Sequence, residues 1–228
     1  MNGEVFRSRL DERVIPGKRL GRHIFHDPRS RDFPADRAAQ IVSVTHKANG
    51  LPLNQGDIGS CTANAVCGAL DSSPDFTGGA PRSENDAIQL YEVETRLEGQ
   101  PYPPNDPGGS GLEVCKAAKQ LGWIASYTHA FGVEHALLAL VVRPVITGIS
   151  WYTSFDTPDA TGLVVIASGA TIRGGHELVA DGIDAANQLV WFWNSWGPSY
   201  GVRGRFCMSF DTWQQLLAQQ GDVTVPTP

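Results

Sequence analysis

The sequence predicts an α+β fold in which a mainly helical first half is followed by a mainly β second half. Three segments between residues 61 and 122 have the composition or the apolar spacing of helices. Four short segments after residue 144 are rich in β-branched and aromatic residues and are separated by glycines, which is typical of antiparallel strands. With 228 residues, 41% of them hydrophobic, the chain can bury the core of one large domain or of two small lobes around a cleft.

The first 45 residues are predicted to form a basic arm that packs on the rest of the chain. Residues 1–37 contain nine Lys and Arg but six Asp and Glu, although the whole chain has a formal net charge of −6. The body, residues 46–228, is therefore acidic. We expect it to divide into a helical lobe over roughly 50–130 and a β lobe over roughly 131–215.

Three helices are predicted in the first lobe. CTANAVCGAL at 61–70 has the small and apolar residues of a buried helix, and Ser60 is placed to be its N-cap. DAIQLYEVETRLEG at 86–99 and LEVCKAAKQLG at 112–122 each end at a glycine, as amphipathic helices commonly do. Between them, PYPPNDPGGSG at 101–111 is the strongest loop signal in the chain.

The second lobe is predicted to be an antiparallel sheet or a partial barrel, because its segments are short, β-branched and aromatic. The segments are PVITGISWYTSF at 144–155, ELVADGID at 177–184, NQLVWFWNSW at 187–196 and GRFCMSF at 204–210.

Charge and composition argue against several classes of function. The net charge of −6 argues against a general nucleic-acid binder, which needs basic patches. No segment approaches the roughly 18 apolar residues of a membrane helix, and the N-terminus lacks the apolar run of a signal peptide. We therefore expect no membrane partner and, by default, a cytoplasmic monomer. The four cysteines match no metal-ligand spacing, so we expect reduced thiols and no metal or organic cofactor.

Three segments contain residues suited to nucleophilic catalysis: QGDIGSC at 55–61, GGHELVADGID at 174–184 and WFWNSWGPSYG at 191–201. Cys61 would lie in the first turn of a helix, where the N-terminus and a neighbouring imidazolium both favour the thiolate. His176 would take the thiol proton and later pass it to a leaving amine. Asn194 would hydrogen-bond the other imidazole nitrogen and orient the ring without adding charge.

Taken in order, these segments resemble the papain-like cysteine peptidases, in which Cys, His and Asn follow one another along the chain. The resemblance runs from about residue 30 to about residue 212. It implies a two-lobe fold, with the nucleophile helix in a helical lobe, an antiparallel partial barrel in the other lobe and a cleft between them. The absence of a signal peptide and of a long prosegment points to a prokaryotic or phage-type member.

The same resemblance implies roles for further residues. Gln55 would donate its side-chain amide to the oxyanion, beside the backbone N–H of Cys61. Trp196, in NSWG, would cover the hydrogen bond between His176 and Asn194. The GG turn would pair with an extended substrate by strand addition. The substrate-binding positions expected on this basis are Gly108, Gly109, Ser110, Gly175, Glu177 and Trp196.

Three positions depart from the family pattern. The family usually has a Cys three residues before the nucleophile and a Trp directly after it, where this chain has Ile58 and Thr62. The residue after the catalytic His is usually small, but here it is Glu177, at a position that lines the pocket for the second residue upstream of the scissile bond. Glu177 alone suggests a preference for Lys or Arg in that pocket.

We therefore expect a cysteine endopeptidase that acts on peptides or proteins through a Cys–His–Asn triad and a thioester acyl-enzyme. Transfer of the acyl group to an amine would use the same thioester, so hydrolase and transpeptidase stay open. The alternatives are a catalytically weak or inactive papain-fold binding or assembly protein, and a cell-wall peptide amidase. The basic arm either packs on the body or lies across the acidic cleft and limits access to it.

Overall fold

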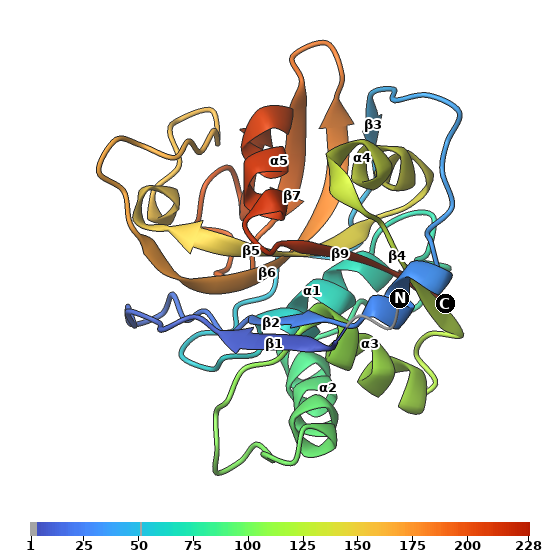
Figure 1. The fold of residues 1–228 in the computed structure, drawn as a ribbon, viewed down its shortest axis with the longest axis vertical. Coiled ribbons are helices and arrows are strands. Elements are labelled where there is room, and N and C mark those ends of the chain that lie inside the picture. The colour runs from blue at the N-terminus through green and yellow to red at the C-terminus, as the bar shows by residue number, and fades with distance from the viewer. Residues whose placement is uncertain (1–3, 51) are drawn as a thin grey trace.

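The computed structural model describes residues 4–50 and 52–228 and confirms the predicted α+β fold (Figure 1). Residues 1–3 of the expected arm and residue 51 of the expected helical lobe lie outside the described residues. Within the described ranges, the helical elements are α1 (Cys61–Leu70), α2 (Glu84–Leu97), α3 (Gly111–Gln120), α4 (Gly132–Val142) and α5 (Phe210–Ala218), with 3-10 turns η1 (Pro28–Asp32) and η2 (Thr153–Asp156).

The three predicted helices agree with α1, α2 and α3 to within two residues at each end. Helix α2 begins earlier than expected because Ser83 and Asp86 form a capping box around its first turn. The three helices pack against one another, and residues of the sheet, Ile146 and Val179, complete their core. The first lobe is thus a small helical cluster built on one side of the sheet, below it in Figure 1.

The larger sheet is antiparallel, with strand order β4-β9-β5-β6-β7-β8 and with β3 paired to β6. In the described part of the chain its strands are β3 (Val44–Thr45), β4 (Ser126–His129), β5 (Val145–Tyr152), β6 (Ile172–Asp184), β7 (Leu189–Trp193), β8 (Arg205–Ser209) and β9 (Asp222–Thr227). Strand β9, close to the C-terminus, lies between β4 and β5 and so next to the centre of the sheet.

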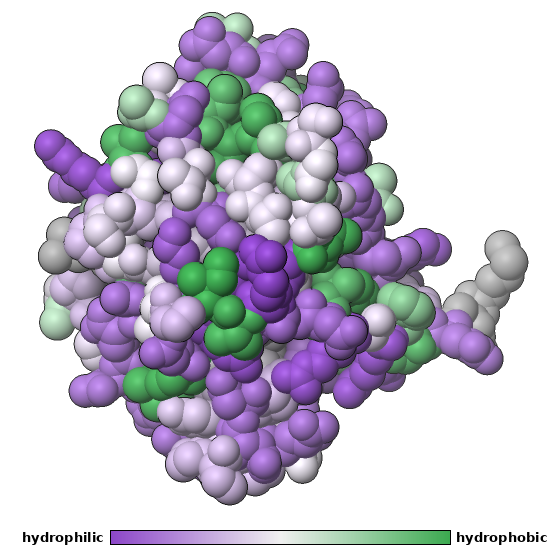
Figure 2. Space-filling view, turned by 90° about the vertical axis from the view of Figure 1, so that its left-hand side faces the viewer, coloured by the Kyte–Doolittle hydropathy of each residue, from purple (hydrophilic) through white to green (hydrophobic). Residues whose placement is uncertain are grey.

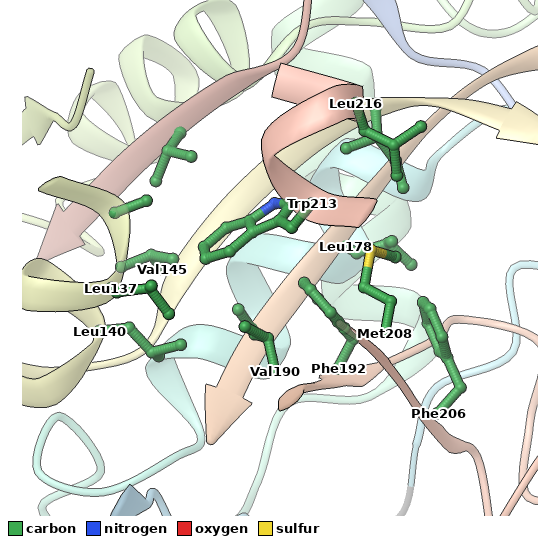
Figure 3. Close-up of a cluster of buried hydrophobic side chains, with 14 of the residues drawn as sticks. Leu137, Leu140, Val145, Leu178, Val190, Phe192, Phe206, Met208, Trp213 and Leu216 are labelled. Atoms are coloured by element: carbon green, nitrogen blue, oxygen red, sulfur yellow. The ribbon is translucent and has the colours of Figure 1, made fainter. Parts of the chain in front are cut away.

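The core of the second lobe lies between this sheet and the helices α4 and α5 (Figure 3). Trp213 of α5 is fully buried among side chains from the sheet and from the helices α4 and α5. Its companions in the close-up include Leu137, Leu140, Val145, Leu178, Val190, Phe192, Phe206, Met208 and Leu216. The sequence did not predict α4 or α5. Helix α4, GVEHALLALVV, is apolar on most of its surface, so its helical period is weak.

Strand β6 is longer than predicted, since it begins at Ile172 and not near residue 177. The glycines in RGGHE looked like a break between strands. In the structure, a Cβ on Gly175 would collide with the backbone carbonyl of Arg22, so the glycine permits close approach of another chain segment.

That segment belongs to the N-terminal arm. Strands β1 (Phe6–Arg9) and β2 (His23–His26) form an antiparallel hairpin that lies between the sheet and the helices in Figure 1. Figure 2 shows the face on the left of Figure 1, where hydrophobic residues form small groups separated by hydrophilic ones. None of the helices within residues 4–50 and 52–228 has the length and apolar character needed to cross a bilayer.

Candidate active site

The candidate nucleophile, Cys61, is the first residue of α1. The turn before it is held by Asp106, whose carboxylate accepts the backbone N–H of Gly59 at 2.9 Å and the hydroxyl of Tyr91 at 2.7 Å. Ser60 precedes the helix as expected, but its side chain makes no capping hydrogen bond and instead accepts the side-chain amide of Asn64. The first turn of α1 therefore keeps backbone N–H groups available near the thiol.

The imidazole of His176, on β6, meets the side chain of Asn194 just after β7. Asn194 Oδ1 lies 2.8 Å from His176 Nε2 and also accepts the backbone N–H of Ser195 at 2.7 Å. Because a backbone N–H can only donate, the bond from Ser195 shows which atom of the Asn194 amide is the oxygen. An amide oxygen can only accept, so His176 Nε2 must donate to it, and a neutral imidazole therefore carries its proton on Nε2. The other nitrogen, Nδ1, is buried and makes no hydrogen bond to the described residues. It is free to accept a proton.

Burial disfavours the charged forms of both Cys61 and His176. Each is completely buried. Burial raises the pKa of the Cys61 thiol far above its ordinary value, although a hydrogen bond from the backbone N–H of Glu177 opposes the rise. Burial also lowers the pKa of His176 to about 3, against the hydrogen bond to Asn194, which raises it. The covered site therefore holds a thiol and a neutral imidazole.

Gln55 is fixed in place by a residue that the sequence reasoning missed. Its side-chain carbonyl accepts the hydroxyl of Ser195, its backbone N–H donates to the carbonyl of Ser195, and its amide Nε2 donates to the carbonyl of Ile58 at 2.8 Å. An amide nitrogen has two hydrogens, so one remains for another acceptor. Ser195 stands next to Asn194 in NSWG, and this adjacency is the only signal in the sequence that could have identified it.

Two indoles enclose the imidazole. Trp196 is stacked on the ring of His176, with centroids 5.1 Å apart and an interplanar angle of 23°. Trp151, from β5, meets the same ring edge-on at 4.9 Å. These contacts exclude water from the pair of His176 and Asn194 and contribute to the burial that keeps the imidazole neutral.

The arm runs between the two lobes at this point. The carbonyl of Gly175 accepts the backbone N–H groups of Gly21 and Arg22 at 3.1 and 3.0 Å. On the other lobe, the backbone N–H of Gly109 donates to the carbonyl of Gly21 at 2.9 Å. The carbonyl of Gly109 accepts the backbone N–H of His23. The arm is thus paired like a strand with two of the three expected substrate-binding glycines, Gly109 and Gly175.

Close packing makes this path possible only with glycines. A Cβ on Gly21 would collide with the backbone of Gly59, two residues before the nucleophile. A Cβ on Gly108, which has a φ of +83°, would collide with the carbonyl of Gly21. The arm therefore packs against the backbone of Gly59 and Gly108, on the helical side of the site.

Ser110, one of the expected substrate-binding positions, is buried at the start of α3. Its hydroxyl caps α3 by accepting the N–H of Glu113 at 3.3 Å, and its own N–H donates to the carboxyl group of Glu94 at 3.0 Å. Glu94 is fully buried and also accepts the hydroxyl of Thr62 at 2.6 Å. Thr62, one of the three departures from the family pattern, thus connects α1 through Glu94 to Ser110, the residue that follows the GG turn.

Glu177 is nearly inaccessible and faces the side chain of Arg22 together with Asp222. Burial raises the pKa of Glu177 well above its ordinary value. The charge of Asp222 raises it further, and that of Arg22 lowers it. Sequence reasoning identified Glu177 but neither Arg22 nor Asp222. In the part of the chain that the structure describes, no group of three His, Cys, Asp or Glu side chains is arranged to hold a metal ion.

Comparison with solved structures gives the fold. Xylellain, a cysteine protease from Xylella fastidiosa, matches with a TM-score of 0.72 and 22% identity, over 96% of this chain and 98% of that one. A procathepsin L 3 of Tenebrio molitor larvae matches with a TM-score of 0.67 and 12% identity, over 93% and 76%. A Carica candamarcensis cysteine protease in complex with E-64 matches with a TM-score of 0.58 and 16% identity, over 81% and 97%.

No protein-family model and no curated protein sequence matches the chain. The structural matches cover between 81% and 96% of the chain, and they show that the chain has the papain-like fold.

Proposed function

We propose that the chain is a cysteine peptidase that cleaves peptide bonds through a thioester on Cys61. The observation that carries the proposal is the pair formed by His176 and Asn194, in which the hydrogen bond at 2.8 Å leaves Nδ1 without a partner among the described residues. The backbone N–H of Glu177, the residue after His176, hydrogen-bonds the thiol of Cys61, so this arrangement lies beside the first turn of α1. The three similar structures, all of cysteine proteases or their proforms, support the same activity.

In the proposed reaction, His176 Nδ1 takes the proton of the Cys61 thiol, and the thiolate attacks the carbonyl carbon of the scissile peptide. The resulting oxyanion accepts the backbone N–H of Cys61 and the second hydrogen of the Gln55 amide. Collapse breaks the C–N bond, and His176 returns the proton to the leaving amine. Water, deprotonated by His176, then hydrolyses the thioester and regenerates the thiol.

The arm is proposed to hold this site closed. It takes the backbone hydrogen bonds of Gly109 and Gly175 that an extended substrate would use, and Cys61 and His176 are both completely buried. A substrate can reach the thiol only after residues 19–23 leave. The complete burial of Cys61 equally suits the alternative, a papain-fold binding protein without turnover.

Gly21→Ala in the full chain separates these two functions. The added methyl group collides with the backbone of Gly59, so it should displace the arm without altering a residue of the triad. We expect this chain to be labelled by E-64 at one site and to cleave a peptide library, and we expect Gly21→Ala/Cys61→Ser to do neither. Val14→Ala, an exposed substitution in the same arm, is the control.

Intact mass and product analysis give the readout. A folded Gly21→Ala chain that neither reacts with E-64 nor cleaves any peptide would exclude the peptidase. It would leave the binding protein as the function. The products would also show whether a peptide crosslink is cleaved or an acyl group is transferred to an amine.

A further inference from the structure

The side chain of Arg22 is fully buried, although it belongs to the basic arm. Its Nη2 donates to the carboxylate of Asp222 and, at 2.7 Å, to the backbone carbonyl of Gln220. A buried guanidinium needs such partners because it cannot lose its charge. Arg22 therefore fills a pocket that is built to hold a cation.

Strand pairing explains how two carboxylates come together in this pocket. In the sheet, Gly148 of β5 stands opposite Glu177 of β6 on one side and opposite Asp222 of β9 on the other. Residues directly opposite one another point to the same face of a sheet. The two carboxylates thus flank a glycine on the face that Arg22 covers.

Two glycines, Gly148 and Gly111, leave room for the carboxylates and for Arg22 in this pocket. Arg22 Nε, Glu177 Oε2 and Asp222 Oδ2 all lie within 3.0 Å of the position that a Cβ would take on Gly148. On the opposite wall, a Cβ on Gly111 would stand 2.9 Å from both Glu177 Oε1 and Asp222 Oδ1. Any side chain at either glycine would fill the pocket.

The pocket has more hydrogen-bonding capacity than Arg22 uses. Both oxygens of Glu177, Oδ1 of Asp222 and the Nε and Nη1 of Arg22 are buried without a hydrogen-bond partner within the described residues. Glu177 therefore faces Arg22 without a hydrogen bond to it in this arrangement. The planar guanidinium of a substrate arginine has donors that match both carboxyl groups. If that arginine entered the pocket along a different path from Arg22, it could hydrogen-bond Glu177 and Asp222 together.

We propose that this pocket is an arginine-selective subsite of the peptidase, with its selectivity set by Glu177 and Asp222 and with Arg22 as its built-in occupant. The proposal rests on the proposed function, since it assumes that substrate replaces the arm between Gly109 and Gly175. The residue of the substrate that pairs with Gly109, as Arg22 does now, places its side chain in the pocket.

The first test measures selectivity in the full-length Gly21→Ala chain. The test compares four peptide substrates. They are identical except for the residue that is proposed to pair with Gly109, and this residue is Arg, Lys, citrulline or Leu. Citrulline keeps the shape of arginine and removes its charge. We expect kcat/KM for the Arg peptide to exceed that for the citrulline peptide by about 10- to 100-fold, which corresponds to one charge-assisted hydrogen-bond pair.

Asp222→Asn or Glu177→Gln in the same chain should reduce this ratio toward one, whereas Asp211→Asn, an exposed carboxylate on α5, should leave it unchanged. Equal turnover of all four peptides by Gly21→Ala would overturn the subsite while keeping the peptidase. Arginine preference that survives both pocket substitutions would overturn the assignment to Glu177 and Asp222.

A second test does not need activity, so it distinguishes failure of the subsite from failure of the peptidase. Arg22→Ala in the full chain leaves the pocket empty, and ethylguanidinium chloride should then raise its melting temperature relative to the same concentration of ethylammonium chloride. Wild type, Arg29→Ala and Arg22→Ala/Asp222→Asn should show no such difference. Arg29 lies outside the pocket and pairs with Asp27. An equal response in all four chains would overturn the subsite.

Discussion

The indole Nε1 of Trp196 donates to the backbone carbonyl of Arg19 at 3.0 Å. The same indole is stacked on His176. One side chain therefore contacts both the candidate triad and the arm that covers it. The state of the arm and the environment of the imidazole are linked through Trp196.

Trp196→Phe should loosen the arm because it keeps an aromatic ring over His176 and removes the hydrogen bond to Arg19. A neutral hydrogen bond is worth about 0.5–1.5 kcal/mol, so the exposed form should become about 2- to 10-fold more populated. The rate at which E-64 labels Cys61 in the full chain, followed by intact mass, measures that population. A labelling rate equal to that of wild type would show that Trp196 does not hold the arm.

The pH dependence of alkylation should change when the arm is displaced. In the covered site the pKa of His176 is lowered to about 3 and that of Cys61 is raised, so neither an imidazolium nor a thiolate is present between about pH 4 and pH 8. We expect iodoacetamide to label wild type slowly across that range and Gly21→Ala rapidly at pH 5. Rapid labelling of wild type at pH 5 that is abolished by His176→Ala would contradict a closed site.

Gln55→Ala should lower kcat of the Gly21→Ala chain by about 100- to 1,000-fold, the usual effect of losing one oxyanion donor. Ser195→Ala should lower it less, because Gln55 keeps its own amide and loses only the hydroxyl that holds its carbonyl. Steady-state kinetics on one peptide gives both values. If Ser195→Ala raised KM alone, Ser195 would contact the substrate and would not position Gln55.

Thr62→Val should destabilise the fold because it leaves one oxygen of the buried Glu94 without a partner. The expected loss in the free energy of unfolding is about 1–3 kcal/mol. Urea denaturation of both chains gives the difference, and Thr45→Val, at an exposed position of β3, is the matched control. A loss as small as that of the control would mean that water replaces the Thr62 hydroxyl.

The pair of Asp181 and Arg205 should make stability depend on pH. Burial raises the pKa of Asp181 to about 6, although Arg205 at 2.9 Å opposes the rise. The carboxyl group of the unfolded chain has a pKa near 3.8, so the folded chain binds this proton more tightly than the unfolded chain does. The stability that this group contributes therefore falls as the pH rises from about 4 through about 6.

The free energy of unfolding of wild type minus that of Asp181→Asn should decrease by about 2–3 kcal/mol between about pH 4 and pH 7 and stay constant above. Urea denaturation at four pH values measures it. A difference that rises with pH would reverse the sign of the shift.

The sequence by itself determined the local elements and the order of the chemistry. Helices α1, α2 and α3 were predictable because caps, glycine ends and apolar spacing are encoded within about 12 neighbouring residues. Cys61, His176 and Asn194 could be proposed from the sequence because each stands in a short motif. Helix α4 lacked a helical period, and β9, in GDVTVPTP, was too short and too rich in proline to be recognised as a strand near the centre of a sheet.

Only the tertiary structure decided what covers the site and what surrounds it. Asp222 meets Glu177 because β9 and β6 both pair with β5, and Arg22 reaches Asp222 from 200 residues away in the sequence. Such contacts depend on which strands become neighbours. Since strand pairing joins segments that are distant in sequence, it leaves no periodic trace in either one, and the arm's path through the site could only be learned from the fold.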